Sequence, residues 1–84
     1  MDHENKNGNT ALMFCCMNGH EKCARALIEA KAAIDTQNTW GNTALMLCCK
    51  NGHEECARAL IEAGAAVDAT EEDGYTALMR CCKN

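Results

Sequence analysis

The sequence has no proline and only three aromatic residues, Phe14, Trp40 and Tyr75. The interior must therefore be built from Leu, Ile, Ala, Cys and Met, which favours thin layers of short helices over a large sheet. A chain of 84 residues forms one small domain with a modest core, and little room is left for an active site beside it. We therefore expect a protein without enzymatic activity and without a cofactor.

An excess of positive charge and a long hydrophobic run are also missing. Eight Lys and Arg stand among twelve Asp and Glu, which gives a net charge of −4, whereas nucleic-acid-binding proteins normally carry a basic face. No apolar run approaches the roughly 20 residues that span a bilayer, and the polar start MDHENKNGN is no signal peptide. We expect no nucleic-acid partner, no membrane association and an intracellular, cytoplasmic location.

Cysteine, in contrast, is abundant, with eight residues in the chain. Without a signal peptide, an even count does not by itself indicate a disulfide framework. The spacing is more informative, because the same residues recur every 33 positions: Gly8, Gly41 and Gly74; Thr10, Thr43 and Thr76; Cys15, Cys48 and Cys81; Cys16, Cys49 and Cys82. A fixed period of this length indicates an array of structural repeats.

The repeats can be delimited by aligning the chain with itself. Residues 5–37 and 38–70 are identical at 24 of 33 positions, and residues 71–84 restart the pattern. We expect a single domain over residues 1–84, with a first repeat at 5–37, a second at 38–70 and a partial third at 71–84.

Each repeat carries the signals of two short helices. A threonine precedes a helix of about eight residues, where its hydroxyl can cap the first free amides. An Asn-Gly pair then provides a left-handed stop, and a second helix begins with acidic residues at its positive end. These signals predict first helices that start at Ala11 and Ala44, second helices over about 21–30 and 54–63, and turn-capping roles for His20 and His53.

Residues 41–69, GNTALMLCCKNGHEECARALIEAGAAVDA, closely resemble the ankyrin repeat pattern G-x-T-P-L-H-x-A-A-x-x-G-H followed by L-L-x-x-G-A-x-V-N/D-A. The resemblance extends over residues 5–84. It implies an all-α repeat solenoid of helix-turn-helix units joined by hairpin-like loops. It also implies a non-catalytic scaffold that binds a protein partner.

The chain departs from that pattern at several positions. Lys31 stands where Gly64 supplies the family's glycine; if the turn still requires a positive φ, the substitution costs about 1 kcal/mol. Alanine replaces the family's proline at Ala11, Ala44 and Ala77, and methionine replaces its histidine at Met13, Met46 and Met79. Each departure is expected to lower stability.

The cysteines fit this resemblance as packing residues. The Cys-Cys pairs replace the family's small Ala-Ala pair on the first helix, and Cys23 and Cys56 take core positions on the second helix. Cysteine behaves as a small hydrophobic residue and suits such sites.

A metal site is disfavoured by helix geometry. Zinc needs four ligands about 2.0–2.3 Å from one centre, whereas packed helices stand about 8–10 Å apart. Cys15 and Cys48 are therefore expected to be too distant to share an ion, and only one of Cys48 and Cys49 can reach Cys56. We predict no metal site, but two facing thiols could hold Cu(I) or oxidise. A soft-metal-binding or redox-sensing solenoid is thus the alternative function.

The resemblance also places the binding surface, at the turn tips and on the exposed side of the first helix. Most positions that differ between repeats fall there, and variation on a constant frame suits recognition. Trp40 and Tyr75 are the main candidates because aromatic residues are enriched in binding hot spots, although each could instead cover the neighbouring turn. The predicted partner-binding residues are Lys6, Asn7, Asn9, Met17, Asn18, Thr39, Trp40, Asn42, Lys50, Asn51, Glu72, Asp73, Tyr75 and Lys83.

The sequence stops after the first helix of the third unit. Leu78 and Cys82 then lack the second helix that would cover them. We expect either a longer array or self-association through this uncapped C-terminal face.

Overall fold

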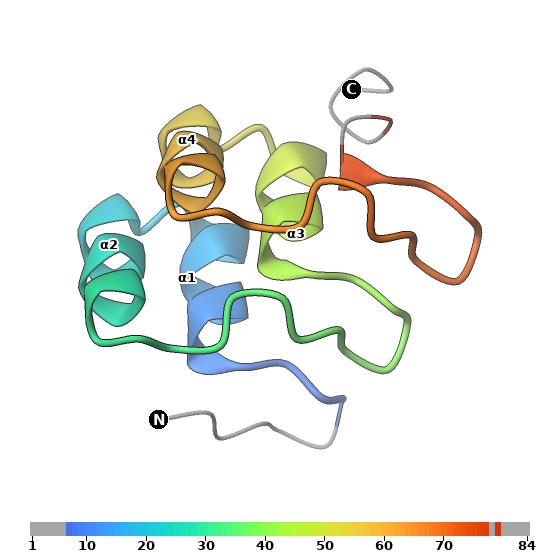
Figure 1. The fold of residues 1–84 in the computed structure, drawn as a ribbon, viewed down its shortest axis with the longest axis horizontal. Coiled ribbons are helices and arrows are strands. Elements are labelled where there is room, and N and C mark those ends of the chain that lie inside the picture. Colours follow the sequence, from blue (N-terminus) through green and yellow to red (C-terminus); the bar gives the residue numbers. More distant parts are fainter. Residues whose placement is uncertain (1–6, 78, 80–84) are drawn as a thin grey trace.

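The computed structural model describes residues 7–77 and 79. It contains four helices, α1 (Ala11–Asn18), α2 (Glu21–Glu29), α3 (Ala44–Lys50) and α4 (Glu54–Glu62), and the residues described include no strand. α1 packs against α2 and α3, while α4 packs against α2 and α3. Two antiparallel helix pairs are thus stacked side by side, with the loops projecting to one side (Figure 1). The predicted repeat solenoid is confirmed.

The first helix of each pair starts at a threonine cap, as predicted. Thr10 Oγ1 accepts a hydrogen bond from the Met13 amide at 3.3 Å, and Met13 Sδ accepts one from the Thr10 amide at 3.4 Å. Thr43 and Met46 repeat the arrangement at 3.3 and 3.5 Å. This is a capping box in which a thioether takes the place of the usual carboxylate or amide. The methionines therefore have a structural role that the sequence did not suggest.

The turn between α3 and α4 joins the two helix pairs. His53 Nε2 donates a hydrogen bond to the Met17 carbonyl at 3.0 Å. His53 is the N-cap residue of α4, but its side chain makes no capping hydrogen bond. Gly19 ends α1 with φ 73°, and a Cβ atom there would lie 2.8 Å from His53 Nδ1. The histidine thus connects the units instead of capping its own helix.

The core is centred on α3. All residues from Ala44 to Cys49 are buried, since this helix packs against both α1 and α4. The largest fully buried side chains are Leu12, Met13, Leu45, Met46 and Leu60, together with Thr43 and the thiols of Cys16, Cys48 and Cys56. Sulfur atoms are therefore a substantial part of the interface between the units.

One expectation about the second helices was wrong. Cys23 is exposed, whereas its repeat equivalent Cys56 is only 1% exposed. Cys56 contacts Cys16 of the preceding unit, whereas Cys23 lies beside Cys15 of its own unit. Ile61 on α4 is likewise at the surface, where it is 54% exposed.

The turn after the second helix keeps one conformation in both units. Lys31 has φ 70° and Gly64 has φ 89°. Each amide donates to the carbonyl three residues earlier, Lys31 to Ile28 and Gly64 to Ile61, both at 3.0 Å. Lys31 therefore adopts the left-handed conformation that glycine tolerates better, as the sequence suggested.

Candidate functional site

The loops between the helix pairs end in tight turns. In the loop before α3, the Gly41 amide donates to the Asn38 carbonyl and the Asn38 amide donates to the Asn42 carbonyl, both at 2.9 Å. Glu71, Gly74 and Tyr75 form the same turn one repeat later, at 2.8 and 3.0 Å. These hydrogen bonds give the loop tips a fixed shape.

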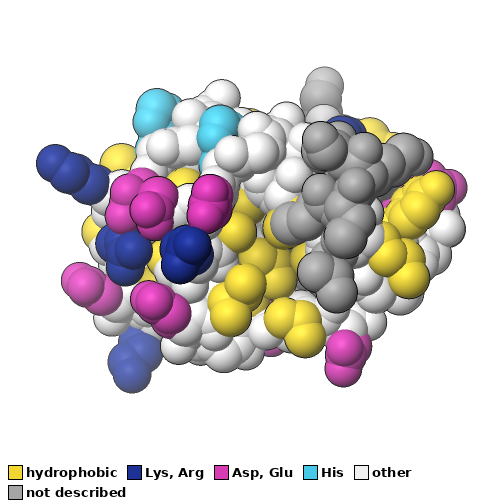
Figure 2. All heavy atoms as spheres, turned by 90° about the horizontal axis from the view of Figure 1, so that it is seen from above, with side chains coloured by type: hydrophobic (Ala, Val, Ile, Leu, Met, Phe, Trp, Pro, Cys, Tyr) yellow, Lys and Arg dark blue, Asp and Glu magenta, His cyan; other side chains and the backbone are white. Residues whose placement is uncertain are grey.

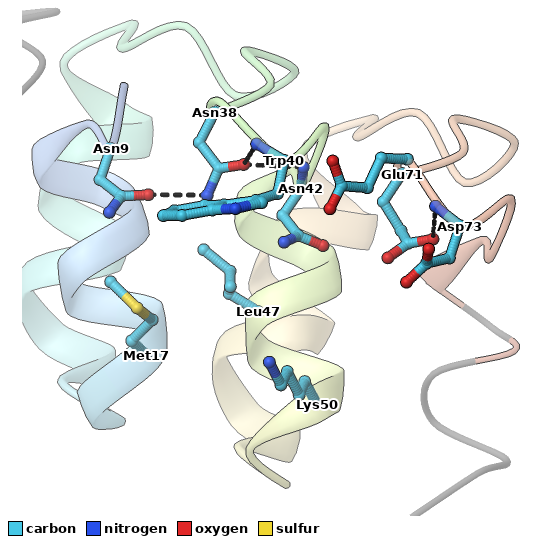
Figure 3. Close-up of a pocket in the computed structure, with 10 residues that line it drawn as sticks. Asn9, Met17, Asn38, Trp40, Asn42, Leu47, Lys50, Glu71 and Asp73 are labelled. Atoms are coloured by element: carbon cyan, nitrogen blue, oxygen red, sulfur yellow. Dashed lines mark hydrogen bonds between the residues drawn. The ribbon is translucent and has the colours of Figure 1, made fainter. Parts of the chain in front are cut away.

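Asn38 organises the first of these tips with its side chain. Its Oδ1 accepts hydrogen bonds from the amides of Trp40 and Asn42, at 3.0 and 2.9 Å. Its Nδ2 donates to Asn9 Oδ1 at 2.8 Å, which links the tip to the preceding unit (Figure 3). The Asn38 side chain therefore fixes the backbone of Trp40, and the indole ring projects from a defined position.

Glu71 takes the place of Asn38 in the next tip. Its Oε1 accepts hydrogen bonds from the amides of Asp73 and Tyr75, at 2.7 and 3.0 Å. The side chain is only 6% exposed. The substitution keeps the acceptor but replaces the amide donor with a carboxylate, so this tip is anionic where the other is neutral.

Successive tips are joined by backbone hydrogen bonds. The Thr39 amide and its Oγ1 donate to the Asn7 carbonyl, at 3.0 and 2.7 Å. The Glu72 amide donates to the Trp40 carbonyl at 2.9 Å. A Cβ atom at Gly41 would lie 3.0 Å from Glu71 Cα, so the close approach of these two tips requires glycine.

A groove of about 410 Å³ lies between the tips and the first helices. Such a volume is typical of sites that accept one or two large side chains or a small ligand. Figure 3 shows the Trp40 ring extending from its loop across Leu47, with Met17 and Lys50 further along α1 and α3 and with Glu71 and Asp73 on the next loop. The groove is lined by Asn9, Met17, Asn38, Trp40, Asn42, Leu47, Lys50, Glu71, Glu72 and Asp73.

The sequence identified much of this groove. Seven of the predicted residues line it: Asn9, Met17, Trp40, Asn42, Lys50, Glu72 and Asp73. Trp40 is 42% exposed. The predicted residues Asn7, Asn18, Thr39, Asn51 and Tyr75 lie outside its lining, and Lys6 and Lys83 lie outside the described residues.

Some of the residues outside the groove have local structural roles. Asn18 Nδ2 donates to the Phe14 carbonyl and Asn51 Nδ2 donates to the Leu47 carbonyl, both at 2.9 Å. These amides satisfy carbonyls near the end of their own helices.

The sequence missed three lining residues, Asn38, Leu47 and Glu71. Each stands at a position that differs between units: Leu47 corresponds to Phe14 and Arg80, and Asn38 corresponds to Glu71. The sequence differences between repeats, which indicated the other binding positions, could have identified these three residues as well. Asn38 and Glu71 are the first residues of the second and third repeats.

Three buried thiols meet at the interface of the helix pairs. Cys48 is hydrogen-bonded to Cys16 and to Cys56. The hydrogen bond with Cys16 raises the pKa of Cys48, and burial raises the pKa of Cys56. The contact between Cys16 and Cys48 crosses the unit boundary. The sequence did not predict it, because the stacking brings Cys48 to Cys16 and not to its repeat equivalent Cys15.

A second, more accessible thiol pair lies within the first unit. Cys15 is partly buried and Cys23 is exposed. Burial and the neighbouring Cys23 raise the pKa of Cys15, and the two side chains are hydrogen-bonded. Cys49, in contrast, is disulfide-bonded and is not a free thiol.

Neither a metal site nor a membrane-spanning helix is found in the described part of the chain. Among residues 7–77 and 79, no three His, Cys, Asp or Glu side chains are arranged to hold a metal ion. None of the described helices has the length and apolar character needed to cross a bilayer.

Comparison with known families agrees with the fold. The chain matches the family described as ankyrin repeats (3 copies) over residues 1–71 and 30–84. No curated protein matches the chain.

Proposed function

Because the chain belongs to the ankyrin repeat family, whose members are generally protein-interaction modules, we propose that it binds a protein partner through the groove at Trp40 without catalysing a reaction. The observation that carries this proposal is a half-exposed tryptophan held on a hydrogen-bonded tip at the edge of the groove. Tryptophan is the residue most enriched in binding hot spots.

The framework around Trp40 supports this role. The Trp40 amide is bound by Asn38, and the Trp40 carbonyl is bound by the Glu72 amide. A side chain on such a fixed backbone loses little conformational entropy when a partner binds. Leu47, which is 6% exposed, and Met17 provide an apolar surface beside the ring.

The wider contact surface is proposed to include the predicted tip and helix residues outside the groove. We further propose a cytoplasmic location. The free thiols of Cys15, Cys16, Cys23, Cys48 and Cys56 favour reducing conditions, whereas the disulfide of Cys49 does not. Self-association through Leu78 and Cys82 also remains a proposal, and both residues lie outside the described part of the chain.

A selection from a random-sequence peptide library, displayed and enriched on the immobilised chain, tests the proposal. Trp40 is the single tryptophan, so its fluorescence reports binding at the groove directly. We expect the selected peptides to change this fluorescence and to bind Trp40→Ala at least about tenfold more weakly. Ile61→Ala, which truncates an exposed hydrophobic residue on α4, is the matched control and should bind normally.

Peptides that bind Trp40→Ala as well as the unchanged chain would contradict the proposal. The same conclusion would follow if the selection enriched no peptide that depends on Trp40. Trp40→Phe provides a second groove variant, in case the alanine variant fails to fold.

The contact between Cys15 and Cys23 favours redox sensing as a second candidate function. In this proposal a low-molecular-weight disulfide oxidises the two thiols to an intramolecular disulfide. Each thiol loses one proton and one electron, and the oxidant is reduced to two small thiols. The alternative of soft-metal binding would use the same two sulfurs.

Mass spectrometry after treatment with oxidised glutathione distinguishes these candidates. Redox sensing predicts loss of two hydrogen atoms and a Cys15–Cys23 cross-linked peptide, which Cys23→Ser abolishes. Soft-metal binding predicts a Cu(I) adduct of the reduced chain that the same variant loses. If the treated chain carries only glutathione adducts and the reduced chain binds no Cu(I), neither candidate holds.

A further inference from the structure

The groove contains a buried side-chain amide to which the described residues make no hydrogen bond. Asn42 lines the groove and is 9% exposed. Its backbone groups are bound by Asn38, but within residues 7–77 and 79 its side-chain amide makes no hydrogen bond. Buried amides are normally satisfied, so an exception in a groove points to a bound partner.

Comparison of the two tips explains why no described residue donates a hydrogen bond to the Asn42 side chain. Its equivalent in the first unit is Asn9, whose Oδ1 accepts a hydrogen bond from Asn38 Nδ2. One repeat later Asn38 is replaced by Glu71, which has no nitrogen to donate. The replacement that makes the second tip anionic therefore also removes the donor that Asn42 Oδ1 would otherwise have.

The charges around this amide are mostly negative. Among the described residues that line the groove, Glu71, Glu72 and Asp73 oppose one cation, Lys50. Glu72 and Asp73 are exposed, and no hydrogen bond or ion pair of their carboxylates occurs in the part of the chain described here. At the equivalent tip position, the three units carry Asn7, Trp40 and Asp73. An aromatic face and a carboxylate therefore stand on neighbouring tips.

We propose that the groove recognises an arginine side chain of the partner protein, which stacks on Trp40 and donates hydrogen bonds to Asn42 Oδ1 and to the carboxylates of Glu72 and Asp73. This inference rests on the proposed function, since it names the partner group that enters the same groove.

A guanidinium matches each of these groups. It has five N–H donors and no acceptor, so it can satisfy an amide oxygen and carboxylates together. It stacks on aromatic faces and forms planar, bidentate pairs with carboxylates, whereas a lysine ammonium acts as a point charge. An acidic partner would meet three carboxylates and is disfavoured. A neutral apolar segment would cover Trp40 but leave Asn42 without a donor.

The peptides selected on Trp40 provide the probe. We expect an arginine to recur among them, and its replacement by lysine to weaken binding about tenfold. On the protein, the double variant Glu72→Gln/Asp73→Asn should also bind about tenfold more weakly. The double variant Glu55→Gln/Glu62→Gln removes the same two charges at exposed positions on α4, outside the groove, and should bind normally.

Asn42→Leu separates recognition from folding. Leucine has a similar volume and removes the unsatisfied amide, so the variant should remain at least as stable in urea. Its affinity for the arginine peptides should nevertheless fall about fivefold. A variant that loses stability but keeps its affinity would assign Asn42 a structural role and overturn this part of the inference.

The outcomes distinguish this inference from the proposed function. Peptides that require Trp40 but lack arginine, or that bind the Glu72 and Asp73 variant normally, would overturn arginine recognition and leave the groove as a binding site. Equal affinity of arginine and lysine peptides would overturn recognition of the guanidinium. Binding that does not depend on Trp40 would remove the proposed function itself.

Discussion

His53 and Met17 lie 36 residues apart in the sequence, yet the imidazole Nε2 of His53 donates a hydrogen bond to the Met17 carbonyl at 3.0 Å. The bond runs from the start of α4 to the last turn of α1 and joins the two helix pairs on the side away from the loop tips. It complements the Asn38–Asn9 bond at the tips, so the unit interface is held by hydrogen bonds at both ends of its thiol-rich core.

Replacement of His53 should loosen this interface. We expect His53→Ala to lower the free energy of unfolding by about 1 to 2 kcal/mol, because the Met17 carbonyl loses its donor. Urea denaturation followed by circular dichroism measures the change. His20 has the equivalent place in the first unit without a side-chain capping bond, so His20→Ala is the control and should change stability little. Equal losses in both variants would argue against the interface role.

Gly19 and Gly52 provide a matched pair at the ends of the first helices. Both have positive φ, 73° and 74°, but only at Gly19 would a Cβ atom meet another residue, His53 Nδ1 at 2.8 Å. Gly52→Ala should therefore cost about 1 kcal/mol from backbone strain alone, and Gly19→Ala about 1 to 3 kcal/mol more. In a His53→Ala background this difference should disappear. If it persists, the clash is not its cause.

Lys31 offers a simple way to stabilise the chain. Its φ of 70° lies in the left-handed region, and Lys31→Gly should raise the free energy of unfolding by about 1 kcal/mol. Gly64→Lys is the reverse control, because Gly64 has a φ of 89° and no atoms that would meet a Cβ. It should lower stability by a similar amount. Thermal denaturation should show a higher melting temperature for Lys31→Gly and a lower one for Gly64→Lys if backbone strain is the cause.

The thiols should react with an alkylating agent in a defined order. Cys23 is exposed, whereas Cys16, Cys48 and Cys56 are buried. Burial also raises the pKa of Cys56, so less of the reactive thiolate is present near neutral pH. Mass spectrometry of the folded, reduced chain at pH 7.4 should find Cys23 labelled first and the buried thiols only after urea is added. Early labelling of Cys56 would contradict the packing described here.

The local elements of this protein could be predicted from the sequence because they depend on neighbouring residues. Thr10 and Thr43 start helices at Ala11 and Ala44, and the left-handed φ of Lys31 was anticipated from its alignment with Gly64. The period of 33 residues then required the units to stack. Periodicity does not reveal which residues of one unit meet those of the next, and therefore the Cys16–Cys48 contact was missed.

The sequence alone thus determined the repeat, the helices and the exposed tips that carry Trp40, because caps, glycines and hydrophobic periodicity act over a few residues. Only the tertiary structure decided that Cys56 is buried and Cys23 exposed, that His53 binds Met17, and that no donor among residues 7–77 and 79 reaches the Asn42 side chain. These outcomes depend on the register between stacked units. At that interface a side chain contacts residues about one repeat away, and these contacts cannot be read from its neighbours along the chain.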